Sequence, residues 1–207
     1  VEKGDYDLME MCYGNIPNVL SELIRTAFIA PEGKMFAVAD FSAIEARVLS
    51  WLAQEKWRLD VFNTHGKIYE ASASLMFGVP IEQVTKGSDL RQRGKTAELA
   101  LGYEGSVNAM EKMDKEKKLS KKEMYSIVAL WRRANPKIVE FWAEVNEKAI
   151  ECVQTRKTKK VSCLVFEHDG TNLTIALPAG RKLYYRNPRV RPNRFGQTGI
   201  VYDGMVQ

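Results

Sequence analysis

The residues with the clearest chemical potential form two groups, and the first contains carboxylates where a predicted strand meets a predicted helix. Asp40 follows the apolar run KMFAVA at 34–39, which favours a buried strand. A carboxylate there is held rigidly, and with the Phe41 carbonyl it offers the oxygen ligands that Mg²⁺ prefers. Glu45 lies about one helical turn further on and can face the same cleft. The alternative is a capping box, in which Ser42 and Glu45 start the helix.

The second group is a stripe of residues at intervals of four: Arg91, Lys95, Leu99 and Tyr103. In a helix they share one face, where the two cations repel each other by roughly a few tenths of a kcal/mol. A bound triphosphate would turn that repulsion into attraction, since Arg offers a planar fork of donors and Lys a compact charge. Tyr103 would then present an aromatic face to a base or sugar. The alternative is a solvated basic stripe, in which Glu98 pairs with a neighbouring cation.

Helical periodicity covers the middle of the chain. Residues 1–34 are predicted to be loop-rich, with short extended pieces around 23–29. Helices are expected after Ser42 and over 55–63, 67–77, 80–84, 87–103, 104–113, 120–134 and 136–153. The last two are separated at Asn135-Pro136, because the residue before Pro disfavours the helical conformation.

The chain after 153 changes to strand patterns. The runs at 161–167 and 173–177 flank His168-Asp169-Gly170, which predicts a β-hairpin with a turn at those three residues. A further strand is expected at 182–186. One strand, many helices and then a hairpin indicate an α+β fold.

The charge distribution and the cysteine content indicate which partners and which cellular compartment to expect. The net charge is +5, and one basic cluster supplies candidate nucleic-acid-binding residues: Lys117, Lys118, Lys121 and Lys122. A solvated basic face is the alternative. Three cysteines without a CxxC pair and two isolated histidines argue against a disulfide framework or a zinc site, so a reducing cytoplasm is expected. The sequence has no apolar run of membrane-spanning length, so no membrane partner is expected.

Five segments resemble, in order, the motifs of the family A (DNA polymerase I-like) DNA polymerases. FAVADFSAIEARVLSWLA resembles motif A, and RQRGKTAELALGYEGS resembles motif B, the O helix. GNIPNVLSELIRTAFIAPEG, GKIYEASASLMFGVP and LPAGRKLYYRNPRV resemble the segments before, between and after these motifs. The resemblance runs from about Gly14 to Tyr185, and the wording LALGYEG is similar to the phage and prophage branch.

The resemblance implies roles around the metal and the sugar. Asp40 would bind the catalytic Mg²⁺ ions, with the Phe41 carbonyl beside it. Glu45 would be the steric gate that excludes a ribose 2′-hydroxyl, in contact with Tyr103. Leu99 stands where the family usually has an aromatic residue against the sugar.

The resemblance also implies which residues would contact the triphosphate and the templating base. Arg91 and Lys95 would hold the triphosphate, and Tyr103 would pack beside the templating base. Tyr69 stands where many members have a triphosphate-binding His.

The family's architecture implies a helical fingers subdomain at 42–153, inserted in a partial antiparallel-sheet palm at 1–41 and 154–207. The parent protein would join a primer 3′-hydroxyl to the α-phosphate of a dNTP, with primer-template DNA and the rest of the polymerase chain as partners. The sequence contains no segment that matches motif C, which carries the second metal-binding Asp, and none that matches the thumb. The chain is therefore expected to be an excised piece that does not polymerise by itself.

Two other functions are compatible with parts of the pattern. A non-catalytic basic nucleic-acid-binding module would account for the lysine clusters, and it predicts DNA binding that is indifferent to dNTP. A single-subunit RNA polymerase shares the architecture, but Glu45 in the gate position favours DNA.

Overall fold

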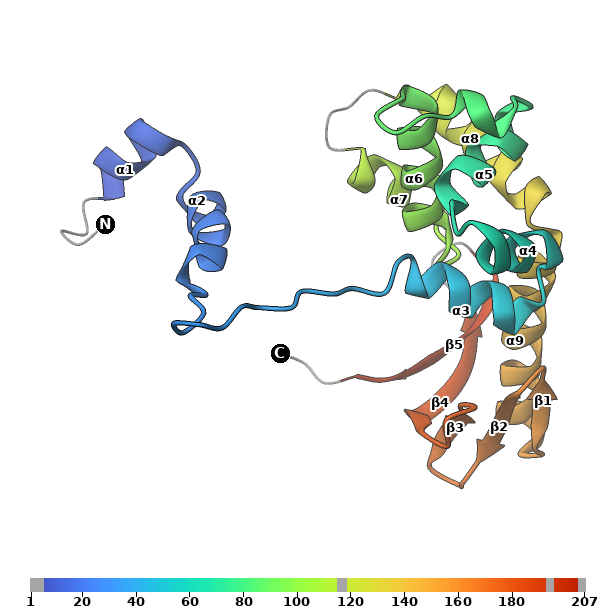
Figure 1. Ribbon diagram of the computed structural model, residues 1–207. Helices are drawn as coiled ribbons and strands as arrows, with labels where there is room; N and C mark the ends of the chain where they lie inside the picture. The colour runs from blue at the N-terminus through green and yellow to red at the C-terminus, as the bar shows by residue number, and fades with distance from the viewer. Residues whose placement is uncertain (1–5, 115–118, 193–195, 205–207) are drawn as a thin grey trace. The chain divides into compact units, whose positions relative to one another are not determined.

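The computed structural model describes residues 6–114, 119–192 and 196–204 (Figure 1). The chain divides after Ser42 into two compact units, 1–42 and 43–207. No helix in the described ranges is both long enough and apolar enough to cross a bilayer. Cys12, Cys152 and Cys163 are all free thiols.

The N-terminal unit begins with helices where loops were predicted. It contains α1 (Tyr6–Tyr13), α2 (Ile16–Leu23) and the short 3₁₀ helix η1 (Ile24–Ala27). The side chain of Asn15 accepts a hydrogen bond from the Asn18 N–H at 3.1 Å, and Pro17 occupies the first turn of α2. An Asn N-cap followed by Pro is a strong helix start, and the loop prediction missed it.

The strand predicted at 34–39 is not formed, and that prediction was wrong. No described strand pairs with this segment, which is extended and exposed; Met35 is 89% and Val38 93% accessible. An apolar, β-branched run becomes a strand only when a neighbouring strand takes its backbone hydrogen bonds. The residue that caps the next helix is Ala43, with a left-handed backbone (φ 51°) and no side-chain cap hydrogen bond, and not Ser42 as the capping-box prediction had it.

The helices of the second unit agree with the sequence periodicity. They are α3 (Ile44–Ala53), α4 (Lys56–Thr64), α5 (Ile68–Phe77), η2 (Ile81–Gln83), α6 (Asp89–Leu101), α7 (Val107–Met113), α8 (Lys121–Ala134) and α9 (Pro136–Thr155). A full capping box between Ser120 and Glu123 starts α8. The apolar faces of these helices enclose a core around Trp131, which is fully buried and stacks on Trp142 at 5.8 Å.

The described residues after α9 form an antiparallel sheet in the order β1-β2-β3-β4-β5. Its strands are β1 (Lys159–Val161), β2 (Leu164–His168), β3 (Asn172–Ala176), β4 (Lys182–Pro192) and β5 (Thr198–Asp203). α9 packs along this sheet (Figure 1), with Cys152 buried against Phe166 and Leu173. The α+β fold and the predicted hairpin are confirmed; β5 was not predicted.

The turn of the β2–β3 hairpin depends on the carboxylate of Asp169. Its oxygens accept hydrogen bonds from the Asn172 side chain (3.0 Å) and from the Asn172 and Thr171 N–H groups (2.6 and 2.9 Å). These bonds favour the charged form and lower the pKa of Asp169 from 3.8 to about 2. Because the pKa is lower in the folded state, the carboxylate stabilises the fold above about pH 4, and this stabilisation is lost as the pH falls towards 2.

We therefore expect Asp169→Ala to melt at a lower temperature than the unaltered chain at pH 6, with the difference shrinking as the pH approaches 2. The NMR titration of the Asp169 carboxyl carbon should have its midpoint near 2. Glu32→Ala, which removes an exposed carboxylate outside the hairpin, serves as the control. A midpoint near 4 for Asp169 would contradict the role of these hydrogen bonds.

Candidate functional site

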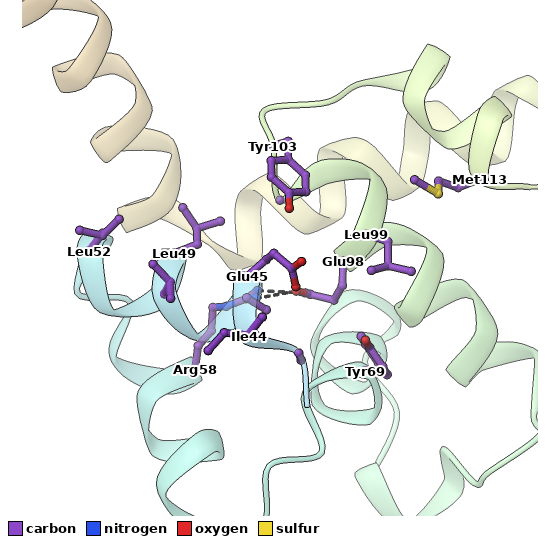
Figure 2. Close-up of a pocket in the computed structure, with 14 residues that line it drawn as sticks. Ile44, Glu45, Leu49, Leu52, Arg58, Tyr69, Glu98, Leu99, Tyr103 and Met113 are labelled. Carbon is purple, nitrogen blue, oxygen red and sulfur yellow. Dashed lines mark hydrogen bonds and ion pairs between the residues drawn. The ribbon is translucent and has the colours of Figure 1, made fainter. Parts of the chain in front are cut away.

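A pocket of about 480 Å³ lies within the second unit, between α3 and the C-terminal half of α6. Its walls include four of the residues predicted to bind nucleotide: Glu45, Tyr69, Leu99 and Tyr103 (Figure 2). Most of the remaining lining is apolar, including Ile44, Val48 and Leu49 from α3. A concave, largely apolar surface with a few polar groups is the usual form of a small-molecule site.

The three polar pocket residues predicted to bind nucleotide lie at or next to helix ends. Glu45 lies in the first turn of α3, Tyr69 in the first turn of α5, and Tyr103 just beyond α6. In Figure 2 Glu45 projects from α3 into the pocket, whose opposite wall on α6 carries Glu98 and Tyr103. The structure therefore places Glu45 and Tyr103 in one pocket, as their predicted contact requires.

Burial changes the chemistry of Tyr69. Loss of water around the ring raises the pKa of the phenol, the negative charge of Glu98 raises it further, and Arg91 opposes the shift. The phenol is thus neutral at physiological pH and can donate a hydrogen bond into the pocket.

The predicted triphosphate-binding cations do not line this pocket; they lie further towards the N-terminus of α6. Arg91 is held by Glu70 of α5, with 2.6 Å between Nε and Oε1, and its guanidinium lies over the Tyr69 ring at 5.6 Å. Lys95 is half-buried and has no ion-pair partner among the described residues. Arg91, Lys95 and Leu99 thus share one helix as predicted, Tyr103 lies just beyond it, and Arg91 is already paired.

The predicted metal ligands belong to the other unit. Asp40 and Phe41 are both exposed at the end of the N-terminal unit. No group of three or more His, Cys, Asp or Glu side chains in the described ranges could hold a metal ion. The assignment of Asp40 and the Phe41 carbonyl to a metal ion stays a prediction.

Two of the four lysines predicted to bind nucleic acid lie in the part of the chain that the structure describes. Lys117 and Lys118 lie outside the described residues. Lys121 and Lys122 are exposed in the first turn of α8, where Lys121 is paired with Glu111 at 3.3 Å. The local charge available to a phosphate backbone is therefore smaller than the sequence cluster indicated.

The floor of the pocket is a buried ion pair that sequence reasoning missed. Arg58 of α4 is fully buried and makes two hydrogen bonds to the carboxylate of Glu98, one of them 2.9 Å from Nη1 to Oε1. Glu98 was considered as a partner for cations of its own helix; its partner is Arg58, 40 residues earlier in the chain. The available signal was the presence of two charged residues on helix faces that are otherwise apolar.

Neutral donors and acceptors complete this ion pair. Arg58 Nε donates to the Ser50 hydroxyl at 2.8 Å, and Nη1 also donates to the Asn135 side chain at 3.0 Å. Glu98 accepts from the Ser72 hydroxyl and from the Trp131 indole, both at 2.8 Å. Every buried side-chain N or O atom in the described ranges has a hydrogen-bond partner, so the network leaves none of them unsatisfied.

Comparison with known proteins shows which family the chain belongs to. The family model for DNA polymerase family A matches residues 13–172. The chain belongs to DNA polymerase family A. The match includes all of the helices that form the pocket as well as the segment with Asp40.

Named relatives in DNA polymerase family A support the assignment. A DNA polymerase of Bacillus phage SP02 is 51% identical over 99% of this chain. The thermostable DNA polymerase I of Thermus aquaticus is 33% identical over 60% of it, and the DNA polymerase I of Pseudomonas aeruginosa is 38% identical over 43%. The chain spans about a third (32%) of the phage protein's length and a smaller part of the bacterial ones.

The buried network around Arg58 and Glu98 predicts that replacing Arg58 strongly lowers the free energy of unfolding. Arg58→Met keeps side-chain volume but leaves Glu98 buried without its counter-charge, which should lower the free energy of unfolding by about 3–5 kcal/mol. The double variant Arg58→Met/Glu98→Gln should recover part of this loss. Urea denaturation followed by circular dichroism measures both.

Arg93→Met is the matched control for Arg58→Met. Arg93 pairs with Asp89 and Glu123 at the surface, so its removal should cost no more than about 1 kcal/mol. Equal losses for the two arginines would show that the buried pair has no special role.

Proposed function

We propose that this chain is the nucleotide-binding part of a template-directed DNA polymerase. In the reaction, the primer 3′-oxygen forms a bond to the α-phosphorus of a dNTP, the bond to the pyrophosphate oxygen breaks, and pyrophosphate leaves. The observation that carries the proposal is the shared pocket of Glu45, Tyr69, Leu99 and Tyr103. Leu99 of this pocket lies on α6, the helix that also carries Arg91 and Lys95. Membership of DNA polymerase family A supports it independently.

The α6 cations are proposed to bind the triphosphate. Arg91 can bind two phosphate oxygens with its planar guanidinium, and Lys95 adds a compact charge one turn along the helix. Phosphoryl transfer depends mainly on positioning the phosphates and neutralising their charge, and these side chains suit that task. Tyr69 adds a neutral hydroxyl as a donor.

The pocket is proposed to take the sugar and base. Glu45 would fill the space next to the 2′ position, so that a ribose hydroxyl meets a carboxylate and the wall of α3. Leu99 offers an apolar contact to the sugar, and the exposed ring of Tyr103 offers a stacking surface beside the templating position.

The other partners follow from the remaining candidate residues. Asp40 and the Phe41 carbonyl are proposed as ligands of Mg²⁺, which supplies charge neutralisation at the phosphates when it is bound. Lys117, Lys118, Lys121 and Lys122 are proposed to contact primer-template DNA through its phosphates. The proposed organisation is a fingers subdomain at 42–153 on a partial palm at 1–41 and 154–207, in a cytoplasmic enzyme.

Titration of the 207-residue chain with dATP, followed by NMR or calorimetry, tests the site. Arg91→Ala and Lys95→Ala are each expected to weaken binding about tenfold or more, because each removes charge-assisted hydrogen bonds worth about 1.5–3 kcal/mol. Arg156→Ala, which removes an exposed cation beyond α9, should leave the affinity unchanged. DNA binding with no response to dATP would favour the non-catalytic module instead.

Glu45→Ala tests the proposed gate. Removing this carboxylate makes room for a 2′-hydroxyl, so the preference for dATP over ATP is expected to fall about tenfold while dATP still binds. The measurement is the ratio of the two dissociation constants. Glu82→Ala, an exposed carboxylate that does not line the pocket, is the control. An unchanged ratio in Glu45→Ala would remove Glu45 from sugar selection.

A further inference from the structure

We infer that Glu70 is a positioning residue that holds the Arg91 guanidinium ready for a triphosphate. This inference rests on the proposed function, because it concerns the same anion site on α6. The motif comparison assigns Arg91 to the triphosphate but assigns nothing to Glu70. The structure adds a specific contact between these two side chains.

The contact follows from the close approach of α5 and α6. At Gly94, a Cβ atom would lie 2.4 Å from the Tyr69 carbonyl oxygen and 3.0 Å from the Ala73 Cβ, so only glycine allows the two backbones to meet here. Gly94 lies between Arg91 and Lys95 on α6, and Tyr69 precedes Glu70 on α5. The helix crossing therefore brings the carboxylate of Glu70 beside the first cation of the stripe.

Glu70 engages only one edge of the guanidinium. The hydrogen bond joins Arg91 Nε to Glu70 Oε1 at 2.6 Å, and the Tyr69 ring lies near one face of the guanidinium. Neither Nη group of Arg91 has a hydrogen-bond partner among the described residues, although the side chain is only 26% exposed. The four N–H bonds on these two nitrogens are the ones that can bind phosphate oxygens in a fork.

The neighbouring cations on α6 differ from Arg91 in the number of carboxylates that bind them. Arg93 is bound by two carboxylates, Asp89 at 2.8 Å and Glu123 at 3.2 Å, and it is not available to an anion in the same way. Lys95 has no ion-pair partner in the described ranges. Glu70 therefore pairs with Arg91 alone, and the two cations and one carboxylate together leave a net positive charge where a triphosphate would lie.

Two physical effects of Glu70 oppose each other. Its negative charge repels a triphosphate, whereas its hydrogen bond removes the rotamer freedom that Arg91 would otherwise lose on binding. We infer that positioning outweighs repulsion, so that Glu70 stays bound to Nε while the Nη groups bind the phosphate. The opposite outcome, in which Glu70 merely blocks Arg91, makes a different prediction for the same variants.

The test compares Glu70→Ala with Glu70→Gln in the 207-residue chain, with inorganic triphosphate and dATP as probes. Glu70→Ala should bind both probes about three- to tenfold more weakly, since Arg91 loses its anchor. Glu70→Gln keeps an oxygen that can accept from Nε and removes the charge, so it should bind at least as tightly as the unaltered chain. Glu82→Ala removes an equal charge elsewhere and should change nothing.

A spectroscopic readout separates positioning from a general effect on the fold. The Arg91 Nε–H resonance should be protected from solvent exchange in the unaltered chain and in Glu70→Gln, remain so when triphosphate is added, and lose protection in Glu70→Ala. Tighter or equal binding by Glu70→Ala, or loss of the Nε–H signal when triphosphate binds, would overturn the inference.

The same assay separates this inference from the proposed function. If Arg91→Ala and Lys95→Ala weaken binding but Glu70→Ala does not, only the role of Glu70 is wrong. If the unaltered chain does not bind either probe, or if neither cation matters, the nucleotide site and the role of Glu70 are both wrong.

Discussion

Arg58 and Glu98 form an ion pair in the interior, away from water, and this burial constrains the residues packed around them. A buried charge without a partner costs several kcal/mol, so each ion must keep its counter-charge and fill its remaining hydrogen-bond positions. The groups that do this come from α3 (Ser50), α5 (Ser72), α8 (Trp131) and the α8–α9 junction (Asn135). Helices that are distant in the chain are thereby held in one arrangement.

That arrangement determines where the functional face of α6 points. Glu98 lies on the buried side of the helix and forms the floor of the pocket with Arg58, and Leu99 and Tyr103 line the same pocket (Figure 2). Glu55 contributes a second anchor, because its carboxylate accepts hydrogen bonds from the Lys137 and Ile138 N–H groups at the start of α9. A carboxylate at a helix N-terminus satisfies free N–H groups and interacts favourably with the helix dipole. The pocket and the sheet-covering helix therefore depend on a shared set of buried polar contacts.

The α5–α6 crossing explains how two cations can lie one turn apart on α6 without destabilising it. Two cations one turn apart would repel each other, and Glu70 offsets part of that repulsion from the neighbouring helix. Gly94 allows the approach that makes this contact possible, and Tyr69 takes its place in the pocket wall through the same crossing. A glycine between two cations of a stripe thus has a packing role that follows from what surrounds it.

Local signals in the sequence were sufficient for most helices, for the hairpin around Asp169 and for the α+β class, because periodicity, caps and turn residues act within a few positions. They also placed Arg91, Lys95 and Leu99 on one helix, whereas Tyr103, predicted on the same helix, lies just beyond its end. The strand predicted at 34–39 failed because a strand depends on a partner that local sequence does not supply. Only the tertiary structure decided that Glu98 pairs with Arg58, that Glu70 holds Arg91, and that Glu45 and Tyr69 share a pocket. These contacts join residues far apart in the chain, and their geometry follows from how the helices pack.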